Sequence, residues 1–272
     1  NEIKINLTTT NSYIDLILEN KQVIFQGSPG SGKSYLTERL SKCLVNDQTD
    51  NIEIIQFHPS YGYEDFVEGY KFTSSGKFEL KDGVFKAFVL KAMRKPYERF
   101  VLIIDEINRG NTANIFGELL YLLEYRNKYI KLKYSHDQLF HVPDNIYILG
   151  TMNTADRSLS LVDYALRRRF SFITLSVDYE QLNAILLEKS CKLDVQVFIE
   201  NIKIINNKIF KTPTLGAGFE IGISYFVSKN ELNLLKLTQI WAFNLKPLME
   251  EYYFDNNSEV EVIKSMLFNN LN

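Results

Sequence analysis

The sequence predicts an α/β fold, with a parallel sheet between helices over residues 1–176 and an all-helical domain over residues 177–272. Three observations predict this fold. Apolar runs that suit strands alternate with segments of helical spacing, which is typical of a parallel sheet. A glycine-rich loop joins the first of these strands to its helix. Beyond Val177 only helical patterns remain, and we therefore place a domain boundary near residue 176.

The first part of the predicted sheet domain contains three strands. The run at 100–104 is apolar throughout, as expected of a central strand that is covered on both faces. Pro96 ends the helix before it, because proline does not fit a helix interior. The elements expected in this part are a capped helix over 8–19, strands over 22–26, 52–57 and 100–104, a hairpin or loop over 71–83, and a helix over 84–95.

The remainder of the chain continues the alternation and then becomes helical. A helix is expected over 112–125, a hairpin insertion over 129–142, strands over 146–151 and 170–174, and between these two strands a helix that ends near Arg167. Five helical patterns follow, over 178–189, 194–209, 230–243, 245–252 and 258–268.

The composition excludes several classes of protein. Hydrophobic residues make up 45% of the chain, which is enough for a substantial core. The net charge of −2 gives no overall case for binding nucleic acid or a membrane, and no apolar run approaches the ~18 residues of a membrane span. Cys43 and Cys191 lack metal-binding spacing, so we expect them to be buried in a reducing, cytoplasmic setting. The start at Asn1 suggests a piece of a longer protein.

The glycine-rich loop after the first strand has the pattern of a P-loop. It reads Gly27-Ser28-Pro29-Gly30-Ser31-Gly32-Lys33-Ser34. The glycines let the backbone turn tightly and point successive N–H groups inward, where they can hold phosphate oxygens. In this pattern Lys33 reaches the β- and γ-phosphates, and the Ser34 hydroxyl is a ligand of Mg²⁺. The loop therefore predicts binding of a nucleoside triphosphate with Mg²⁺.

Two carboxylates and an amide follow the next buried strands. Asp105 and Glu106 end the apolar run at 100–104, and Asn153 ends the strand after it. Carboxyl ends of parallel strands meet at one edge of the sheet, where ligands bind, so these side chains should lie beside the P-loop. We expect Asp105 to hold Mg²⁺, mainly through water, opposite Ser34. Glu106 would polarise the attacking water, and the neutral Asn153 amide would bond that water and the γ-phosphate without charge repulsion.

Three adjacent arginines, Arg167, Arg168 and Arg169, follow the next helix. They can form a solvated helix end that complements the helix dipole. They can also reach into the site of a neighbouring subunit and neutralise transition-state charge, an effect worth about 10³–10⁵ in rate. Their position after the strand that ends in Asn153 favours the second interpretation.

These motifs together resemble the AAA+ superfamily of P-loop NTPases, and within it the McrB family. The most specific stretch is Met152-Asn153-Thr154-Ala155-Asp156-Arg157-Ser158, because other AAA+ proteins do not read this way. The resemblance extends over nearly the whole chain, through segments at 57–70, 104–111, 166–170, 221–226 and 247–254. It implies an αβα nucleotide-binding core followed by a helical lid domain.

The resemblance also implies a function. McrB-type proteins are GTP-hydrolysing motors that assemble into hexameric rings, and they power DNA translocation and cleavage by a partner endonuclease subunit, McrC. The resemblance implies that Asn153 is the sensor-one residue and that Arg168 and Arg169 are the trans-acting arginines. The family's N-terminal domain, which recognises modified DNA, has no counterpart in this chain, so DNA is expected to bind through the full-length protein. Ile223 stands where many relatives have histidine, and we assign that lid motif no catalytic role.

The choice of nucleotide follows only from the family. GTP is expected, with ATP as the alternative, because no guanine-reading NKxD motif is present. Residues near Tyr13, Phe25 and Tyr225 are candidates for contact with the base.

Other interpretations stay open. A MoxR-like AAA+ ATPase would remodel a protein complex without touching DNA, although the motif around Asn153 disfavours it. A nucleotide-gated scaffold would form a ring on binding and hydrolyse little. The aromatic stretch at 57–70 is either core packing or a surface that contacts a subunit or DNA. The insertion at 129–142 is either part of a ring pore or a solvated hairpin, with a slight preference for the hairpin.

Overall fold

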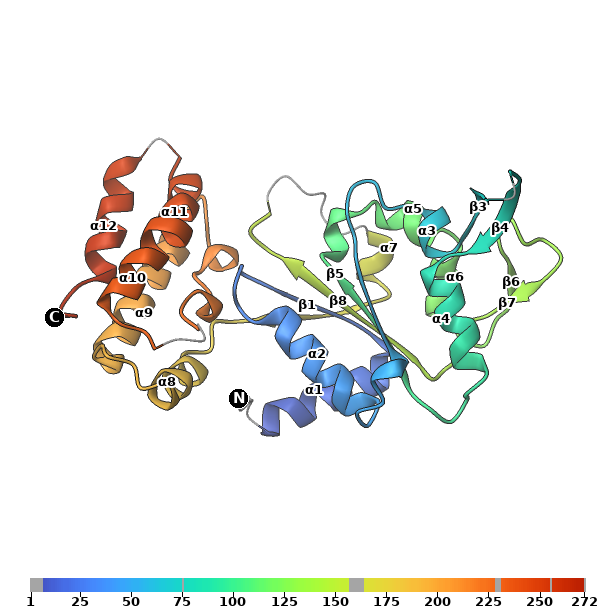
Figure 1. The fold of residues 1–272 in the computed structure, drawn as a ribbon, viewed down its shortest axis with the longest axis horizontal. Helices are drawn as coiled ribbons and strands as arrows, with labels where there is room; N and C mark the ends of the chain where they lie inside the picture. The colour runs from blue at the N-terminus through green and yellow to red at the C-terminus, as the bar shows by residue number, and fades with distance from the viewer. Residues whose placement is uncertain (1–6, 75, 157–163, 228–230, 255, 272) are drawn as a thin grey trace.

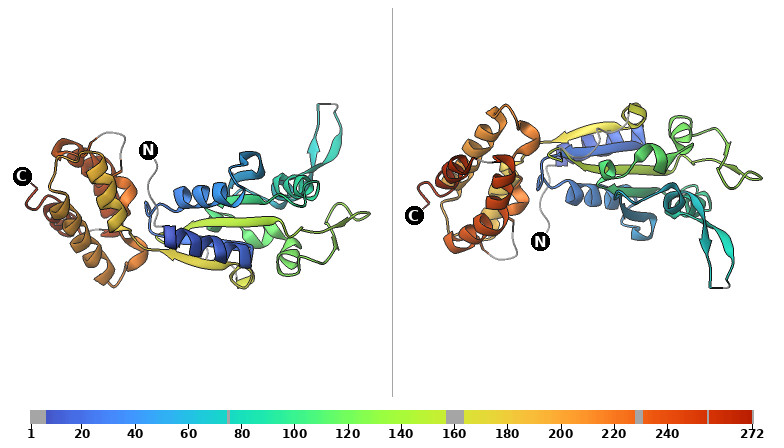
Figure 2. Two further views of the ribbon diagram at one scale, coloured as in Figure 1. Left: turned by 90° about the horizontal axis from the view of Figure 1, so that it is seen from below. Right: turned by 90° about the horizontal axis from the view of Figure 1, so that it is seen from above.

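The computed structural model describes residues 7–74, 76–156, 164–227, 231–254 and 256–271. It has a sheet with helices on both faces, followed by a group of helices (Figure 1). The predicted α/β class with an all-helical second part is therefore confirmed. Both views of Figure 2 place the helical part at one end of the molecule and two hairpins at the other.

The main sheet has five strands, each parallel to its neighbours. Their spatial order is β2 (Ile52–Gln56), β5 (Phe100–Asp105), β8 (Ile146–Asn153), β1 (Gln22–Gly27) and β9 (Ser171–Leu175). The register pairs Gly27 at the start of the P-loop with Asn153, and Gln56 with Asp105. The polar strand ends and the P-loop therefore meet at one edge of the sheet.

Side chains of the central strands alternate between two cores, as strand geometry requires. On one face, Val23 and Phe25 of β1 pack with α1 (Leu7–Asn20) and α2 (Lys33–Leu44). On the other face, Ile24 belongs to the core that includes α4 (Val84–Met93). All three side chains are fully buried, and each such burial contributes about 1.5–3 kcal/mol.

The helix predicted over 112–125 is wrong in one respect, because it is two helices. α5 (Thr112–Phe116) and α6 (Leu119–Glu124) are separated at Gly117, whose φ is +48°. The ring of Tyr63 lies 3.2 Å from the position that a Cβ at Gly117 would occupy. A left-handed backbone packed against an aromatic ring interrupts the hydrogen-bond ladder, and helical spacing alone does not reveal it.

The helical part from Val177 onward has its own cluster of buried side chains. Its helices are α8 (Tyr179–Glu188), α9 (Val195–Lys211), α10 (Leu234–Ile240), a π-helical turn (Trp241–Leu245), α11 (Lys246–Tyr252) and α12 (Asn257–Leu267). The helices predicted over 230–243 and 245–252 thus form one continuous run from Leu234. The N-cap side chains of α8, α9, α10 and α12 accept backbone N–H bonds, each worth about 1 kcal/mol; these are Asp178, Asp194, Asn233 and Asn256. The boundary near residue 176 stays a prediction.

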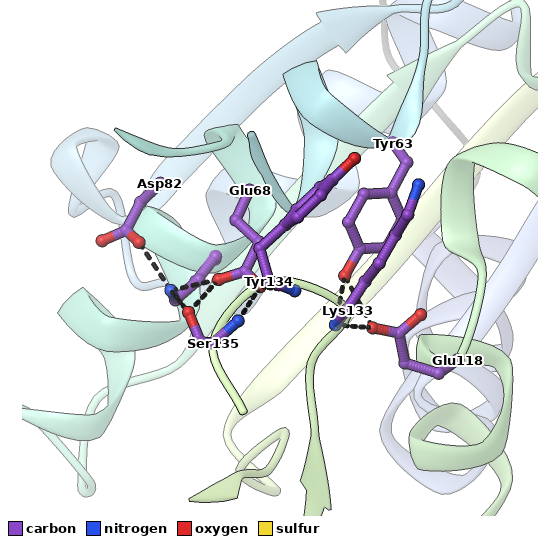
Figure 3. A network of polar contacts seen from close by, with 8 residues as sticks. Tyr63, Glu68, Asp82, Glu118, Lys133, Tyr134 and Ser135 are labelled. Atoms are coloured by element: carbon purple, nitrogen blue, oxygen red, sulfur yellow. Dashed lines mark hydrogen bonds and ion pairs between the residues drawn. The ribbon is translucent and has the colours of Figure 1, made fainter. Parts of the chain in front are cut away.

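The two hairpins at the far end of the sheet domain are joined by a buried polar network. They are β3 (Glu68–Phe72) with β4 (Phe78–Asp82), and β6 (Ile130–Lys131) with β7 (Leu139–Phe140). The fully buried Glu68 accepts hydrogen bonds from the N–H groups of Tyr134 (2.9 Å) and Ser135 (2.8 Å), from the Ser135 hydroxyl, and from the Lys86 ammonium (2.7 Å) (Figure 3). Lys86 also pairs with Asp82 at 2.7 Å.

Aromatic side chains of the stretch at 57–70 pack in the core next to this network, where the ring of Tyr63 contacts that of Tyr134. Phe57, Tyr63 and Phe66 are buried, and the short helix α3 (Tyr63–Phe66) carries the last two into the core. This half of the stretch is therefore core packing, whereas Tyr70 on β3 is 57% exposed.

Three smaller predictions can also be compared with the structure. Cys43 is exposed and Cys191 is only half-buried, so the expected burial of both cysteines is wrong. The helix predicted before Arg167 is described only as α7 (Tyr164–Arg167), since residues 157–163 lie outside the described ranges. Among the described residues, we find no helix with the length and apolar character needed to cross a membrane.

Candidate nucleotide-binding and hydrolysis site

Lys33 is the first residue of α2, and its side chain reaches back to the start of the P-loop. Its side chain is buried, and its ammonium donates to the carbonyls of Gly27 (3.1 Å) and Ser28 (2.8 Å). Burial lowers the pKa of Lys33 to about 8, against the opposing effect of nearby carboxylates, of which Glu106 has the largest effect. The ammonium also donates to the Ser31 hydroxyl at 3.4 Å, so three neutral acceptors hold it in a poorly solvated position, and a phosphate anion would be a better partner.

Ser34 and Asp105, the two residues expected to hold the metal, are in contact with each other. The exposed Ser34 hydroxyl donates to Oδ1 of Asp105 at 3.2 Å, and the Thr151 hydroxyl donates to the same oxygen. One hydroxyl and one carboxylate are a donor set that suits Mg²⁺, which is typically bound through one or two carboxylates, substrate phosphates and waters. The residues present therefore fit the predicted ion.

Glu106 directly follows β5 in an unusual backbone conformation. Its φ is +53°, in the left-handed region that a residue with a side chain rarely adopts, and its N–H donates to the Thr151 hydroxyl at 3.3 Å. Burial raises the pKa of the Glu106 carboxyl; Arg109 opposes this shift, while Asp156 and Asp105 reinforce it. Strain of this kind, held in place by its neighbours, is common at functional sites.

The Glu106 carboxylate has a partner on each oxygen. Asn153 donates from Nδ2 to Oε1 at 2.7 Å, and Arg109 donates from Nε to Oε2 at 3.3 Å. Arg109 also donates to Asp156 at 3.4 Å, and so it bridges the end of β5 and the segment after β8. The structure thus brings Glu106 and Asn153 together, as the sequence predicted.

The two arginines predicted to act in trans have different surroundings. Arg169 donates to the carbonyls of Leu120 (2.6 Å) and Ala165 (2.8 Å) and pairs with Glu124 at 2.8 Å. The Arg168 side chain is exposed, and in the described part of the chain no hydrogen-bond or ion-pair partner is found for it. Arg168 is therefore free to reach outward, while Arg169 is anchored within its own chain. The trans role of both stays a prediction.

The helical part contacts the P-loop directly through a short segment after α9. The Ser224 N–H, in the 3-10 turn Ile223–Tyr225, donates to the Gly30 carbonyl at 3.0 Å. A Cβ on Gly222 would lie only 2.1 Å from the carbonyl carbon of Gly30, so this close approach requires glycine. Ile223, in the same turn, is buried.

A cavity of about 540 Å³ opens beside the P-loop, between the sheet domain and the helical part. Ser31 and Gly32 line it on the phosphate side, and Tyr13 and Tyr35 contribute aromatic rings. Of the base-contact candidates, Tyr13 therefore lies at the cavity, Phe25 is buried behind it at a ring-centroid distance of 5.9 Å, and Tyr225 packs on Gly30 instead. A larger hollow of about 890 Å³ lies within the helical part, away from the P-loop.

Three side chains of the site had no predicted role. Thr151 bonds both carboxylate residues at the end of β5, and Arg109 links Glu106 to Asp156. Arg109 and Asp156 stand inside the motifs that the sequence analysis quoted, so their position within those motifs was the available signal. Thr151 offered none, because a threonine in a buried strand is ordinary.

Comparison with known proteins finds matches to two protein families and to components of two restriction enzymes. The AAA domain family (dynein-related subfamily) matches residues 22–170, and the alpha-helical lid domain of McrB matches residues 198–261. The EcoKMcrB subunit of a type IV methyl-directed restriction enzyme from Escherichia coli (strain K12) is 40% identical over 271 residues, which cover 94% of this chain and 59% of that protein. Component YdiS of the type II restriction enzyme BsuMI from Bacillus subtilis (strain 168) is 30% identical over 196 residues, 57% of each chain.

The chain thus spans less than two thirds of the length of either relative. The family matches cover both the sheet domain with its P-loop and the helices that follow it. On these grounds the chain belongs to the AAA domain family, in its dynein-related subfamily, and within it to the McrB family.

Proposed function

We propose that this chain is the nucleotide-hydrolysing motor part of an McrBC-like restriction system. In this proposal it forms a hexameric ring, hydrolyses GTP, and drives DNA translocation and cleavage by a partner endonuclease subunit of the McrC type. The observation that carries the proposal is the cluster of Lys33, Ser34, Asp105, Glu106 and Asn153 at one edge of the sheet. The similarity to two components of restriction enzymes supports the cellular role.

Each residue of the cluster has a role that follows from its position. Lys33 exchanges its carbonyl partners for the β- and γ-phosphates, and Ser34 with Asp105 would hold Mg²⁺. The metal, when bound, neutralises charge on the phosphate oxygens. Glu106, whose pKa is raised, accepts a hydrogen bond from the attacking water and so polarises it. Asn153 holds the Glu106 carboxylate in place by donating from Nδ2 to Oε1 at 2.7 Å. Arg109 keeps Oε2 of Glu106 oriented by a hydrogen bond, and because a guanidinium retains its protons, Glu106 stays a carboxylate.

Completion of the site by a neighbouring subunit is the reason for proposing a ring. The described residues around Glu106 provide Lys33 and Arg109 as cations, and Arg109 is already shared between two carboxylates. The exposed Arg168 is the side chain that a neighbour can supply to the developing charge on the γ-phosphate.

The test of this function is hydrolysis of GTP and ATP measured in parallel, with and without DNA and a co-expressed McrC-type partner. We expect GTP to be hydrolysed faster than ATP and the partner to stimulate the reaction. ATP hydrolysis that neither DNA nor the partner changes would favour a MoxR-like remodelling activity. Ring assembly on a non-hydrolysable analogue, without turnover of either nucleotide, would instead make the chain a scaffold.

Glu106→Gln tests the assignment of the water-activating group. The glutamine keeps the size of the side chain and its contact with Asn153, but it cannot polarise water as a carboxylate does. We expect nucleotide affinity to change little and turnover to fall by about 10²–10⁴. Glu53→Gln, a change at an exposed carboxylate on β2, is the control and should leave both unchanged. Steady-state hydrolysis at the wild-type rate in Glu106→Gln would contradict the assignment.

A further inference from the structure

The cavity beside the P-loop is placed to receive the nucleoside of a bound triphosphate. Ser31 and Gly32 form its inner wall, so phosphates held by the P-loop bring the sugar and base to its mouth. Its volume of about 540 Å³ exceeds the ~300 Å³ lower bound of small-molecule sites. This step rests on the proposed function, because it assumes that the P-loop holds a triphosphate.

The walls of the cavity offer aromatic faces to a flat base. Tyr13 is fixed edge-to-face against the buried Phe25, with an interplanar angle of 82°. Tyr35, at the start of α2, is 40% exposed and its hydroxyl accepts a bond from Arg39 at 3.3 Å. Rings held in this way can stack on a base, but stacking alone does not distinguish guanine from adenine.

Asp178 also lines the cavity and carries an exposed carboxylate. Its Oδ1 accepts the Gln181 N–H at 2.8 Å and so caps α8, whereas among the described residues Oδ2 has no hydrogen-bond partner. Asp178 and Tyr13 line the same cavity, and burial, and after it the charge of Asp178, raises the pKa of Tyr13. A carboxylate has about four acceptor positions, and the cap uses one of them.

We propose that Asp178 reads the guanine base of the nucleotide by accepting hydrogen bonds from its N1–H and 2-amino groups. Guanine presents these two donors side by side, whereas adenine presents an N1 acceptor that a carboxylate repels. Lys203 lines the same cavity and carries an ammonium that suits the O6 acceptor of guanine. A carboxylate and an ammonium together therefore match guanine and mismatch adenine.

The test is Asp178→Asn, because asparagine caps a helix as well as aspartate and leaves the fold of α8 in place. The affinities of GTP, ATP and XTP are measured with Mg²⁺ on the wild-type chain and on the variant. We expect GTP to bind about 10–100-fold more weakly to the variant, and ATP to change less than about twofold. XTP should bind more tightly to the variant, since the amide N–H can donate to the 2-carbonyl of xanthine.

Glu188→Gln, an exposed carboxylate at the other end of α8, is the matched control and should bind all three nucleotides as the wild type does. A GTP-to-ATP affinity ratio that is the same in Asp178→Asn and in the wild type would overturn the inference while leaving triphosphate binding intact. Failure of the wild-type chain to bind any of the three nucleotides would instead overturn the proposed function. The two failures are therefore distinguishable.

Discussion

Each end of the sheet domain holds a buried lysine and a glutamate, which is fully buried at the hairpin end (Glu68) and partly buried at the nucleotide edge (Glu106), and the two pairs behave in opposite ways. At the nucleotide edge, the pKa of Lys33 is lowered to about 8 and that of Glu106 is raised. At the hairpin end, burial alone would shift Lys86 and Glu68 in the same directions, but their hydrogen bonds outweigh it, so the pKa of Lys86 is raised and that of Glu68 is lowered.

The difference lies in the supply of partners. Glu68 receives four hydrogen bonds, and Lys86 has two carboxylates within 2.7 Å (Figure 3). Lys33 has only neutral acceptors within bonding distance, and Glu106 lies near two further carboxylates. Charges that are buried with enough partners stabilise a structure, whereas charges that are buried with too few are available to a ligand. Glu68, Lys86, Asp82 and Ser135 therefore form a structural network, the hairpin clamp, whereas Lys33 and Glu106 belong to the candidate reaction site.

The same rule distinguishes Arg168 from Arg169 and gives the largest expected effect. Arg169 is anchored by Leu120, Ala165 and Glu124, whereas the Arg168 side chain is exposed and has no hydrogen-bond or ion-pair partner among the described residues. We predict that Arg168→Ala lowers hydrolysis by about 10³ or more without changing the stability of the chain. Turnover assays and thermal unfolding of the variant measure the two quantities.

Mixing experiments show whether Arg168 acts between subunits. In an equal mixture of Arg168→Ala and Lys33→Ala chains, about a quarter of the interfaces of a ring combine an intact P-loop with an intact arginine. Activity should therefore return in the mixture although each variant alone is inactive. A mixture that stays inactive would show that Arg168 acts within its own chain or not at all. Arg169→Ala should instead lower the unfolding temperature, because it leaves Glu124 unpaired.

Much of the reaction site was predictable because its signals are local in the sequence. The P-loop from Gly27 to Ser34, the Asp105–Glu106 pair and Asn153 each directly follow an apolar strand, and a parallel sheet must bring such ends together. The sequence alone therefore predicts which side chains meet at this edge of the sheet.

The partners of these residues were less accessible, because they depend on tertiary packing. The anchoring of Arg169 requires Glu124, which is 45 residues away and lies on a helix whose start is fixed by the break at Gly117. The hairpin clamp likewise depends on Glu68 and Ser135, 67 residues apart. Hydrophobic periodicity located the elements that carry these side chains, but it contains no information on which polar groups pair across them.

The hairpin clamp gives the second prediction, at the level of stability. Glu68→Gln removes one charge of a buried ion pair and should lower the free energy of unfolding by about 3 kcal/mol. The matched control is Glu79→Gln in the same hairpin, whose pair with Lys81 at 2.9 Å is exposed and should contribute less than about 0.5 kcal/mol. Urea unfolding measures both variants.

The pH dependence of this clamp has a definite sign. The pKa of Glu68 is lower in the folded chain than the ordinary value of 4.5, so its contribution is fully present above that value and is lost as the pH falls through the folded pKa. The stability difference between wild type and Glu68→Gln should accordingly be constant from pH 6 to pH 7 and shrink below about pH 4.5. Equal costs for Glu68→Gln and Glu79→Gln at neutral pH would show that the clamp is not structural.

The smallest expected effect is the proton uptake by Lys33 on nucleotide binding, and it tests directly whether the two buried lysines, Lys33 and Lys86, differ. Its pKa of about 8 means that the free chain has lost about half of this proton at pH 8. A bound triphosphate favours the charged ammonium and raises the pKa again, so binding at pH 8 should take up about half a proton, and nucleotide affinity should fall as the pH rises through 8. Calorimetry in two buffers with different heats of ionisation measures this uptake.

Because Glu106 raises the pKa of Lys33, the Glu106→Gln variant should show a larger uptake at the same pH. Binding without proton uptake at pH 8 would mean that Lys33 is already as well partnered as Lys86, and the contrast between the two ends of the domain would disappear.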